Sequence, residues 1–158
     1  MTDADDKTTS YSYFDNGDLE RVTDPRTGAT SYSYDPFGNP TVIIDPVGNR
    51  TERNYDDRSR LESSSDTFGH NLTQTYDVLD RLRQSKRTDS KGSSADEVIT
   101  RTYYPGGQVR TETNGLGLLT ELTLDGLNRV VRKVEIGGGL SEPLTAVTVY
   151  DGNGNVTE

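Results

Sequence analysis

The sequence is organised around the stretch Tyr34-Asp35-Pro36-Phe37-Gly38-Asn39-Pro40, in which an aromatic residue is followed four positions later by glycine. The outline recurs at anchor residues spaced 21, 21, 21, 27, 21 and 26 positions apart: Tyr13, Tyr34, Tyr55, Tyr76, Tyr103, Leu124 and Tyr150. Turn residues stand four positions after the anchors: Gly17, Gly38, Ser59, Asp80, Gly107, Asn128 and Gly154. Mainly apolar residues stand six positions after them: Leu19, Pro40, Leu61, Leu82, Val109, Val130 and Val156. Self-similarity at such a period indicates stacked supersecondary units rather than one globular core.

Each period contains two strand-like segments and two bends. Ser10-Tyr11-Ser12-Tyr13 and Thr30-Ser31-Tyr32-Ser33-Tyr34 alternate polar and aromatic residues, which is typical of half-buried strands. The bend after an anchor holds turn formers, as in Pro105-Gly106-Gly107. A second strand such as Thr41–Ile44 then leads into a second bend such as Asp45-Pro46-Val47-Gly48. Strands of about six or seven residues and bends of about four fill the period, so each unit is predicted to be one β-hairpin.

The two longer units carry their extra residues in the second bend, at Asp89–Glu97 and Gly137–Pro143. After the latter insertion, Thr148–Tyr150 takes the place of the strand that ends at an anchor. Apolar residues do not keep helical spacing over three turns anywhere, so no helix is expected. We therefore predict an all-β fold, an antiparallel meander of up to about fourteen short strands that forms a curved or spiralling sheet strip.

Composition limits both the core and the partners. Only 29% of the residues are hydrophobic, glycine not counted, against about 45–50% with glycine included in ordinary soluble domains. Low hydrophobicity with high net charge is also a signature of disorder, but the regular tyrosines argue against disorder. A net charge of -9 and scattered Lys and Arg disfavour nucleic acid and anionic membranes as partners. The chain has no Cys, and its sequence lacks an apolar run long enough for direct membrane insertion. We expect residues 1–9 to be a flexible acidic tail, with any export signal outside the chain.

Candidate sites are few. Asp151-Gly152-Asn153-Gly154-Asn155 has the alternating oxygen ligands that open a calcium loop, but position six is Val156, so a turn without metal is the better interpretation. His70, the only histidine, has no second His or Cys for a shared metal. The carboxylates recur with the repeat, and nothing distinguishes a catalytic pair. We predict no catalytic residues, no metal and no cofactor.

Four tyrosines are the candidate ligand-binding residues: Tyr11, Tyr13, Tyr32 and Tyr34. They are expected on one face of two equivalent strands. There they could stack on a glycan, but tyrosines repeated at one position are also what a sheet uses for cross-strand packing. Packing is the favoured interpretation.

The repeat resembles the YD repeat of the Rhs (rearrangement hot spot) family. The similarity lies in Tyr-Asp followed five and six residues after the Tyr by Arg-Leu or Asn-Val, as in Tyr55–Leu61, Tyr76–Leu82 and Tyr150–Val156. The family includes bacterial Rhs and wall-associated toxins, shell subunits of insecticidal toxin complexes, and teneurins. The resemblance implies a β-sheet strip that spirals into a hollow shell around a C-terminal toxin, and in some members carbohydrate binding or cell contact. The family's self-cleaving segment is not recognisable, because Asp24-Pro25, Asp35-Pro36 and Asp45-Pro46 lie in ordinary repeat bends.

Two functions remain as hypotheses. The favoured one is a non-enzymatic structural module in the shell or stalk of a large secreted or cell-surface bacterial toxin or adhesin. Residues 10–158 would then be about seven repeats, the last incomplete, of a longer array whose partners are the rest of the shell and an encapsulated toxin domain. The alternative is a module that binds carbohydrate or protein at a cell surface through its aromatic strip. In isolation, exposed edge strands favour self-association.

Overall fold

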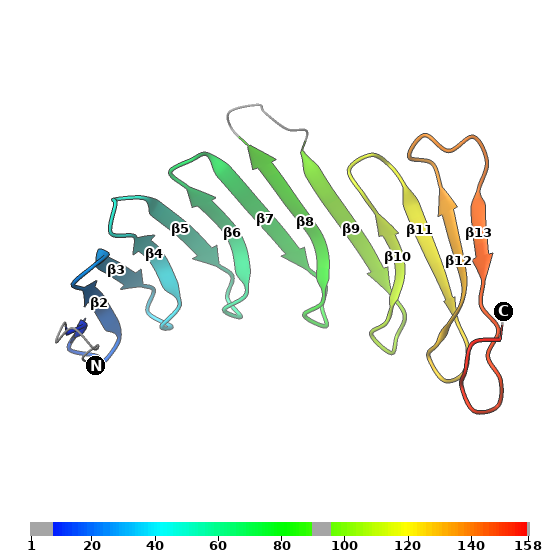
Figure 1. Ribbon diagram of the computed structural model, residues 1–158, viewed down its shortest axis with the longest axis horizontal. Coiled ribbons are helices and arrows are strands. Elements are labelled where there is room, and N and C mark those ends of the chain that lie inside the picture. The colour runs from blue at the N-terminus through cyan, green and yellow to red at the C-terminus, as the bar shows by residue number, and fades with distance from the viewer. Residues whose placement is uncertain (1–7, 90–95, 158) are drawn as a thin grey trace. The chain divides into compact units, whose positions relative to one another are not determined.

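The computed structural model describes residues 8–89 and 96–157 (Figure 1). Most of the predicted acidic tail and most of the 89–97 insertion lie outside these residues. The described residues form thirteen strands in one antiparallel sheet, in which strand order follows chain order. The strands are β1 (Ser10–Tyr13), β2 (Leu19–Asp24), β3 (Gly28–Tyr34), β4 (Pro40–Ile44), β5 (Arg50–Tyr55), β6 (Leu61–Asp66), β7 (His70–Tyr76), β8 (Leu82–Asp89), β9 (Glu97–Tyr103), β10 (Val109–Thr113), β11 (Leu119–Leu124), β12 (Val130–Ile136) and β13 (Leu144–Val147). The predicted all-β antiparallel meander is confirmed.

Two compact units divide the chain. The first comprises residues 1–73 and 88–94, and the second comprises residues 74–87 and 95–158. The described part of the chain forms no helix, as the sequence predicts. Within that part there is accordingly no helix long and apolar enough to cross a membrane.

The repeat spacing coincides with the strand bounds. Each of the first six anchors is the last residue of a strand, and each residue six positions later begins the next strand. At the end of β3, Tyr34 lies opposite Pro40 whereas Ser33 lies opposite Val42, so one residue of β4 is skipped. The same shift occurs between Ser12 and Tyr13 and between Asn54 and Tyr55. Shifts also occur at Tyr103 and Leu124, so these five anchors sit at β-bulges, where the strand bends into its turn.

The residue four positions after each anchor has a positive φ. This residue is glycine in four repeats, but it is Ser59 (φ 60°), Asp80 (φ 64°) and Asn128 (φ 62°) in the others. A type I turn followed by one left-handed residue, which forms a bulge, is a common hairpin connection. Asp and Asn tolerate this conformation better than most residues, which explains the replacement of glycine at Asp80 and Asn128.

Gly38 offers a direct test of this requirement. Its φ is +84°, and a Cβ at this position would have nothing within 4 Å, so an added methyl group meets strain but no clash. We expect Gly38→Ala to lower the free energy of unfolding by about 1–2 kcal/mol, the cost of a left-handed conformation, measured by urea titration. Gly126 also has open space but no positive φ. Gly126→Ala is the matched control, with a change within about 0.5 kcal/mol; equal effects would contradict the requirement.

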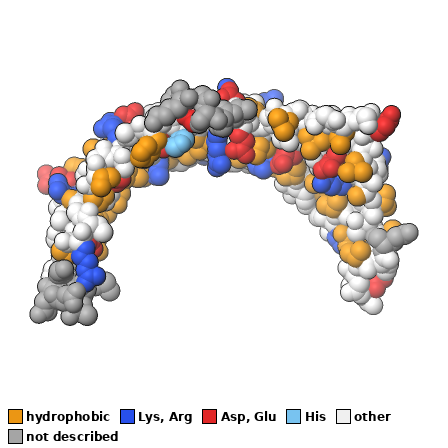
Figure 2. Space-filling view, turned by 45° about the horizontal axis from the view of Figure 1, so that its top comes forward, with side chains coloured by type: hydrophobic (Ala, Val, Ile, Leu, Met, Phe, Trp, Pro, Cys, Tyr) orange, Lys and Arg blue, Asp and Glu red, His pale blue; other side chains and the backbone are white. Residues whose placement is uncertain are grey.

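The sheet has almost no interior. Among the described residues only Val134 of β12 is a buried hydrophobic residue, at 6% exposure. Figure 2 shows hydrophobic side chains spread over the visible surface between charged and polar ones. Stability must therefore come chiefly from hydrogen bonds along the strands and from side-chain pairs between neighbouring strands.

The end of the array differs from the prediction. The residues expected to form a strand, Thr148–Tyr150, lie beyond β13, and Tyr150 forms only an isolated bridge with Val156. The preceding strand pairing runs from Glu135 opposite Leu144 to Arg132 opposite Val147. Thr148 still donates its N–H to the carbonyl of Val131 at 3.0 Å, so the chain stays attached to β12 without regular strand geometry. The insertion 137–143 forms the connection between β12 and β13, as predicted.

Candidate functional site

The most regular feature of the molecule is a five-residue corner, defined here by positions 1 to 5 of the bend between two strands. In the corner Asp35–Asn39, the N–H of position 1 donates to the carbonyl of position 5 at 3.0 Å, and the N–H of position 4 donates to the carbonyl of position 1 at 3.1 Å. The same two bonds close the corners Asp56–Arg60, Asp77–Arg81, Asp125–Arg129 and Asp151–Asn155, and also Asp45–Asn49 and Asn114–Leu118 at second bends.

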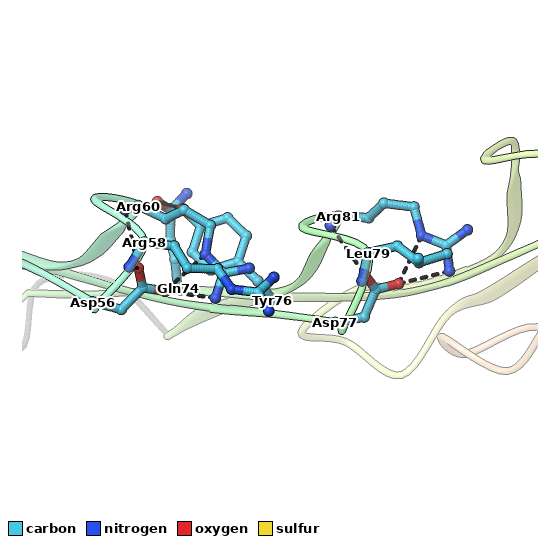
Figure 3. Close-up of polar contacts among 8 residues, drawn as sticks. All are labelled: Asp56, Arg58, Arg60, Gln74, Tyr76, Asp77, Leu79 and Arg81. Carbon is cyan, nitrogen blue, oxygen red and sulfur yellow. Dashed lines mark hydrogen bonds and ion pairs between the residues drawn. The ribbon is translucent and has the colours of Figure 1, made fainter.

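The aspartate at position 1 holds the corner together. Asp77 accepts through Oδ1 from the backbone N–H groups of Leu79 (2.9 Å) and Arg81 (3.0 Å), while its Oδ2 accepts from Arg81 Nε (2.7 Å) (Figure 3). Asp56 makes the equivalent bonds with Arg58 (2.9 Å) and with Arg60 (3.1 Å from the backbone, 2.8 Å from Nε). Each carboxylate thus satisfies backbone donors that the tight turn leaves without strand partners.

These contacts favour the ionised carboxylate. The side-chain hydrogen bond from Arg60, with backbone N–H groups adding to it, lowers the pKa of Asp56 to about 2, although desolvation opposes the shift. The pKa is also lowered at the other corner aspartates: Asp24, Asp35, Asp45, Asp66, Asp77, Asp125 and Asp151. A carboxylate held in this way is a weak proton acceptor, so the corners are poor candidates for general-base chemistry.

Position 5 links one repeat to the next. The guanidinium carbon of Arg81 lies 4.6 Å from the centre of the Tyr103 ring, and that of Arg129 lies 4.3 Å from the Tyr150 ring. Arg81 also donates from Nη1 to the carbonyl of Tyr104 at 2.9 Å. In both cases the ring belongs to the next anchor along the chain, so a cation–π contact joins consecutive corners.

Anchor tyrosines also form hydrogen bonds with the preceding repeat. Three of them donate from their hydroxyl groups to the backbone carbonyl of the residue six positions after the previous anchor: Tyr55 to Pro40 (3.2 Å), Tyr103 to Leu82 (2.6 Å) and Tyr150 to Val130 (3.2 Å). The sequence predicted that these tyrosines pack between strands, but it did not predict their hydroxyl hydrogen bonds or their contacts with arginine. The pattern that could have indicated the corners is the recurrence of Asp at position 1 with Asn, Arg or His at position 5.

We expect Tyr103→Phe to lower the free energy of unfolding by about 1 kcal/mol, because it removes the 2.6 Å bond to Leu82 while keeping the ring beside Arg81. Urea or thermal unfolding measures the change. Tyr13 ends β1 at 59% exposure, and its hydroxyl makes no recorded hydrogen bond in the described structure. Tyr13→Phe is therefore the control, with no measurable change. A loss as large in the control would mean that the hydroxyl bond does not couple the repeats.

The four predicted tyrosines fall into two groups. Tyr11 and Tyr13 on β1 are 51% and 59% exposed, whereas Tyr32 and Tyr34 on β3 are half-buried. Tyr11 lies opposite Val22, which lies opposite Thr30, so Tyr11 and Tyr32 share a face with β2 between them. The Tyr34 ring packs edge-on against Phe14, with ring centres 6.4 Å apart.

The other predicted candidates are corner residues. His70 takes position 5 after Asp66: its N–H donates to Asp66 Oδ1 at 3.0 Å and its Nδ1 lies 2.8 Å from Oδ2. Asp151 accepts from the N–H groups of Asn153 (2.9 Å) and Asn155 (2.8 Å). Across residues 8–89 and 96–157 no group of three or more His, Cys, Asp or Glu is placed to hold a metal ion.

The fold and its corners define an array of β-hairpin repeats. Residues 14–50 match the family model described as RHS Repeat, which confirms the resemblance found in the sequence. The curated proteins give no match. Two solved structures share the fold: the crystal structure of TcdB2-TccC3-TEV (TM-score 0.52, 12% identity, 94% of this chain) and that of TcdB2-TccC3-Cdc42 (TM-score 0.54, 14% identity, 95% of this chain). This chain spans only 10% and 14% of those two chains.

Proposed function

We propose that this chain is a non-enzymatic structural repeat module, which builds part of the β-sheet shell or stalk of a large secreted or cell-surface bacterial Rhs-type toxin or adhesin. The observation that carries the proposal is the use of the polar side chains at the corners. Asp77 binds its own turn, Arg81 reaches the ring of Tyr103, and Tyr103 bonds back to Leu82. These groups connect neighbouring repeats, so they are committed to cohesion within the sheet rather than to chemistry on a substrate.

The near absence of a core supports the same proposal. A wall needs strong contacts within its plane, whereas an independent globular domain needs a buried interior. Within the described residues only Val134 is a buried hydrophobic residue. On this proposal the chain's partners are further repeats of a longer array and a toxin domain enclosed by it.

Protease protection of the longer protein tests the shell. We expect an enclosed domain to be cleaved more rapidly by added protease when Asp56→Ala opens a corner in the wall. Asp57→Ala is the matched control, since Asp57 is the next residue, is exposed, and makes no recorded corner bond. Faster cleavage in Asp56→Ala alone supports the wall. Rapid cleavage of the enclosed domain in the unaltered protein would contradict it.

The exposure of Tyr11 and Tyr13 favours one alternative, a carbohydrate- or protein-binding module for cell-surface contact. Aromatic rings that are 51% and 59% exposed can stack on a sugar face or on an apolar side chain. Titration calorimetry with a glycan panel would test it, comparing the unaltered chain with a variant carrying Tyr11→Ala and Tyr13→Ala. Phe37→Ala, at a corner residue that is 77% exposed, is the control. Saturable binding lost only with the tyrosines supports binding; absence of binding to every glycan removes the glycan form of this alternative.

The strand order also supports self-association of the isolated chain. β1 and β13 stand at the two ends of the described sheet, and each has one side without a neighbouring strand in that order. Sedimentation velocity should show species larger than a monomer that grow with concentration. A monomer at all accessible concentrations would contradict pairing through these edges.

A further inference from the structure

The first corner departs from the repeat in a specific way. Phe14–Asp18 closes with the same two backbone bonds as the other corners, both at 2.9 Å. Position 1, however, is Phe14 instead of an aspartate, and position 5 is Asp18 where the corners at 77–81 and 125–129 have arginine. The charge at position 5 is therefore reversed while the backbone is unchanged.

At this corner position 5 supplies no guanidinium for the next anchor ring, unlike the corners at 77–81 and 125–129. Arg81 lies over the next anchor, Tyr103, and Arg129 lies over the next anchor, Tyr150. The anchor that follows Asp18 is Tyr34. Among the described residues no Lys or Arg lies over the Tyr34 ring. The Tyr34 ring instead contacts the Phe14 ring edge-on.

A shallow hollow occupies this place. The residues that line it include Phe14 and Tyr34 and three aspartates, Asp15, Asp18 and Asp35. Asp18 is half-buried, and Asn16 fixes it by donating from Nδ2 to Oδ2 at 2.7 Å. Desolvation and, after it, the negative charge of Asp18 raise the pKa of Tyr34, so the carboxylate acts electrostatically on the ring. Asp35 is engaged in its own corner, with bonds to Phe37 and Asn39.

We propose that this hollow binds a guanidinium group, supplied by an arginine side chain of a partner segment. A planar guanidinium can stack on the Tyr34 ring and at the same time donate two hydrogen bonds to the Asp18 carboxylate. The described part of the chain uses the first half of this arrangement itself, with Arg81 at Tyr103 and Arg129 at Tyr150. The proposal is separate from the structural role above and does not depend on it.

The site is tested by titrating a small guanidinium compound into the full chain and measuring the NMR chemical shifts of the tyrosine ring protons. The probe is N-acetyl-arginine amide, with the neutral isostere N-acetyl-citrulline amide and the point charge N-acetyl-lysine amide as comparisons. We expect saturable shifts at Tyr34 with a Kd in the millimolar range for arginine, weaker binding of lysine and none of citrulline. If a short arginine-containing peptide binds more tightly than the single residue, the guanidinium is supplied by a protein segment. If the peptide and the single residue bind equally, the site takes free arginine, and the proposal of a partner segment is wrong.

Two variants separate the site from general charge effects. Asp18→Asn should weaken arginine binding at least about tenfold, whereas Asp57→Asn, which changes the net charge equally at an exposed position outside the hollow, should leave it unchanged. Asp18→Arg should abolish binding by placing a guanidinium of the chain itself near Tyr34. Circular dichroism confirms that each variant is folded. Equal binding of arginine and citrulline, or equal losses in Asp18→Asn and Asp57→Asn, would overturn the proposal.

Discussion

Deletion of residues 35–55, one complete period, is expected to leave a folded β-sheet protein with a single unfolding transition. The deletion joins Tyr34 to Asp56, so a strand end is again followed by an intact corner and by β6. Tyr34 takes the place of Tyr55 at the end of a strand, and both residues precede a corner of the same kind. The urea m-value should fall by about an eighth, in proportion to the residues removed. Circular dichroism and urea unfolding provide the measurement.

Deletion of residues 35–44, one strand and one corner, should be far more damaging. In the native sheet Tyr32 lies opposite Ile43, and Ile43 lies opposite Thr51, so Tyr32 shares a face with Tyr55. The shorter deletion places Tyr34 where Ile44 was, opposite Arg50, and thereby moves every later side chain to the other face relative to β3. We expect separate unfolding transitions on the two sides of the junction. If both deletions unfold alike, the period is not the structural unit.

Acid should unfold this protein steeply, with the loss of stability confined to the range from about pH 4 down to about pH 2. Eight corner aspartates have pKa values lowered from the ordinary 3.8, and that of Asp56 falls to about 2. The unfolded chain binds protons at these groups first as the pH falls. The stabilisation is therefore complete above the unfolded pKa and is lost through the folded pKa. Urea midpoints measured from pH 7 to pH 2 would record it.

The chain contains its own control for this prediction. Asn114 stands at position 1 of a corner and accepts through Oδ1 from the N–H groups of Leu116 and Leu118, both at 3.0 Å. An amide therefore supports the turn without titrating. Asp56→Asn should keep the two backbone bonds, lose the ion pair with Arg60, and make the acid transition less steep. An unchanged slope in this variant, or a transition centred near neutral pH, would contradict the role of the carboxylates.

The strand bounds were predictable because one period repeats in the sequence. Tyr34 ends β3 and Pro40 begins β4, as the spacing indicates. The position of the last strand was not: β13 ends at Val147, three residues before the anchor Tyr150, although the fourth unit, which also carries an insertion, keeps its anchor Tyr103 at the end of β9. Thr148–Tyr150 then keeps its sequence likeness to the other anchors but loses their regular pairing.

The site was only partly predictable. The tyrosines were identified as the residues with the strongest claim to a role, but their bonding was not anticipated. Whether Arg81 meets its own Asp77 or the ring of Tyr103 depends on the distance between neighbouring strands, and in the structure it meets both. Likewise, Tyr11 is more exposed than Tyr32 because β1 is the first strand of the sheet, whereas β3 has a neighbouring strand on each side.

The near absence of a buried interior has a mechanical consequence. When force is applied to the two ends of a chain whose strands are neighbours in sequence order, the hydrogen bonds of the outermost strand pair carry the load before those of the next. Few hydrophobic contacts have to break simultaneously, because Val134 is the only buried hydrophobic residue in the described part of the chain. The sheet should peel from its ends strand by strand at low tension and rewind in the reverse order, as nearest-neighbour repeat arrays do.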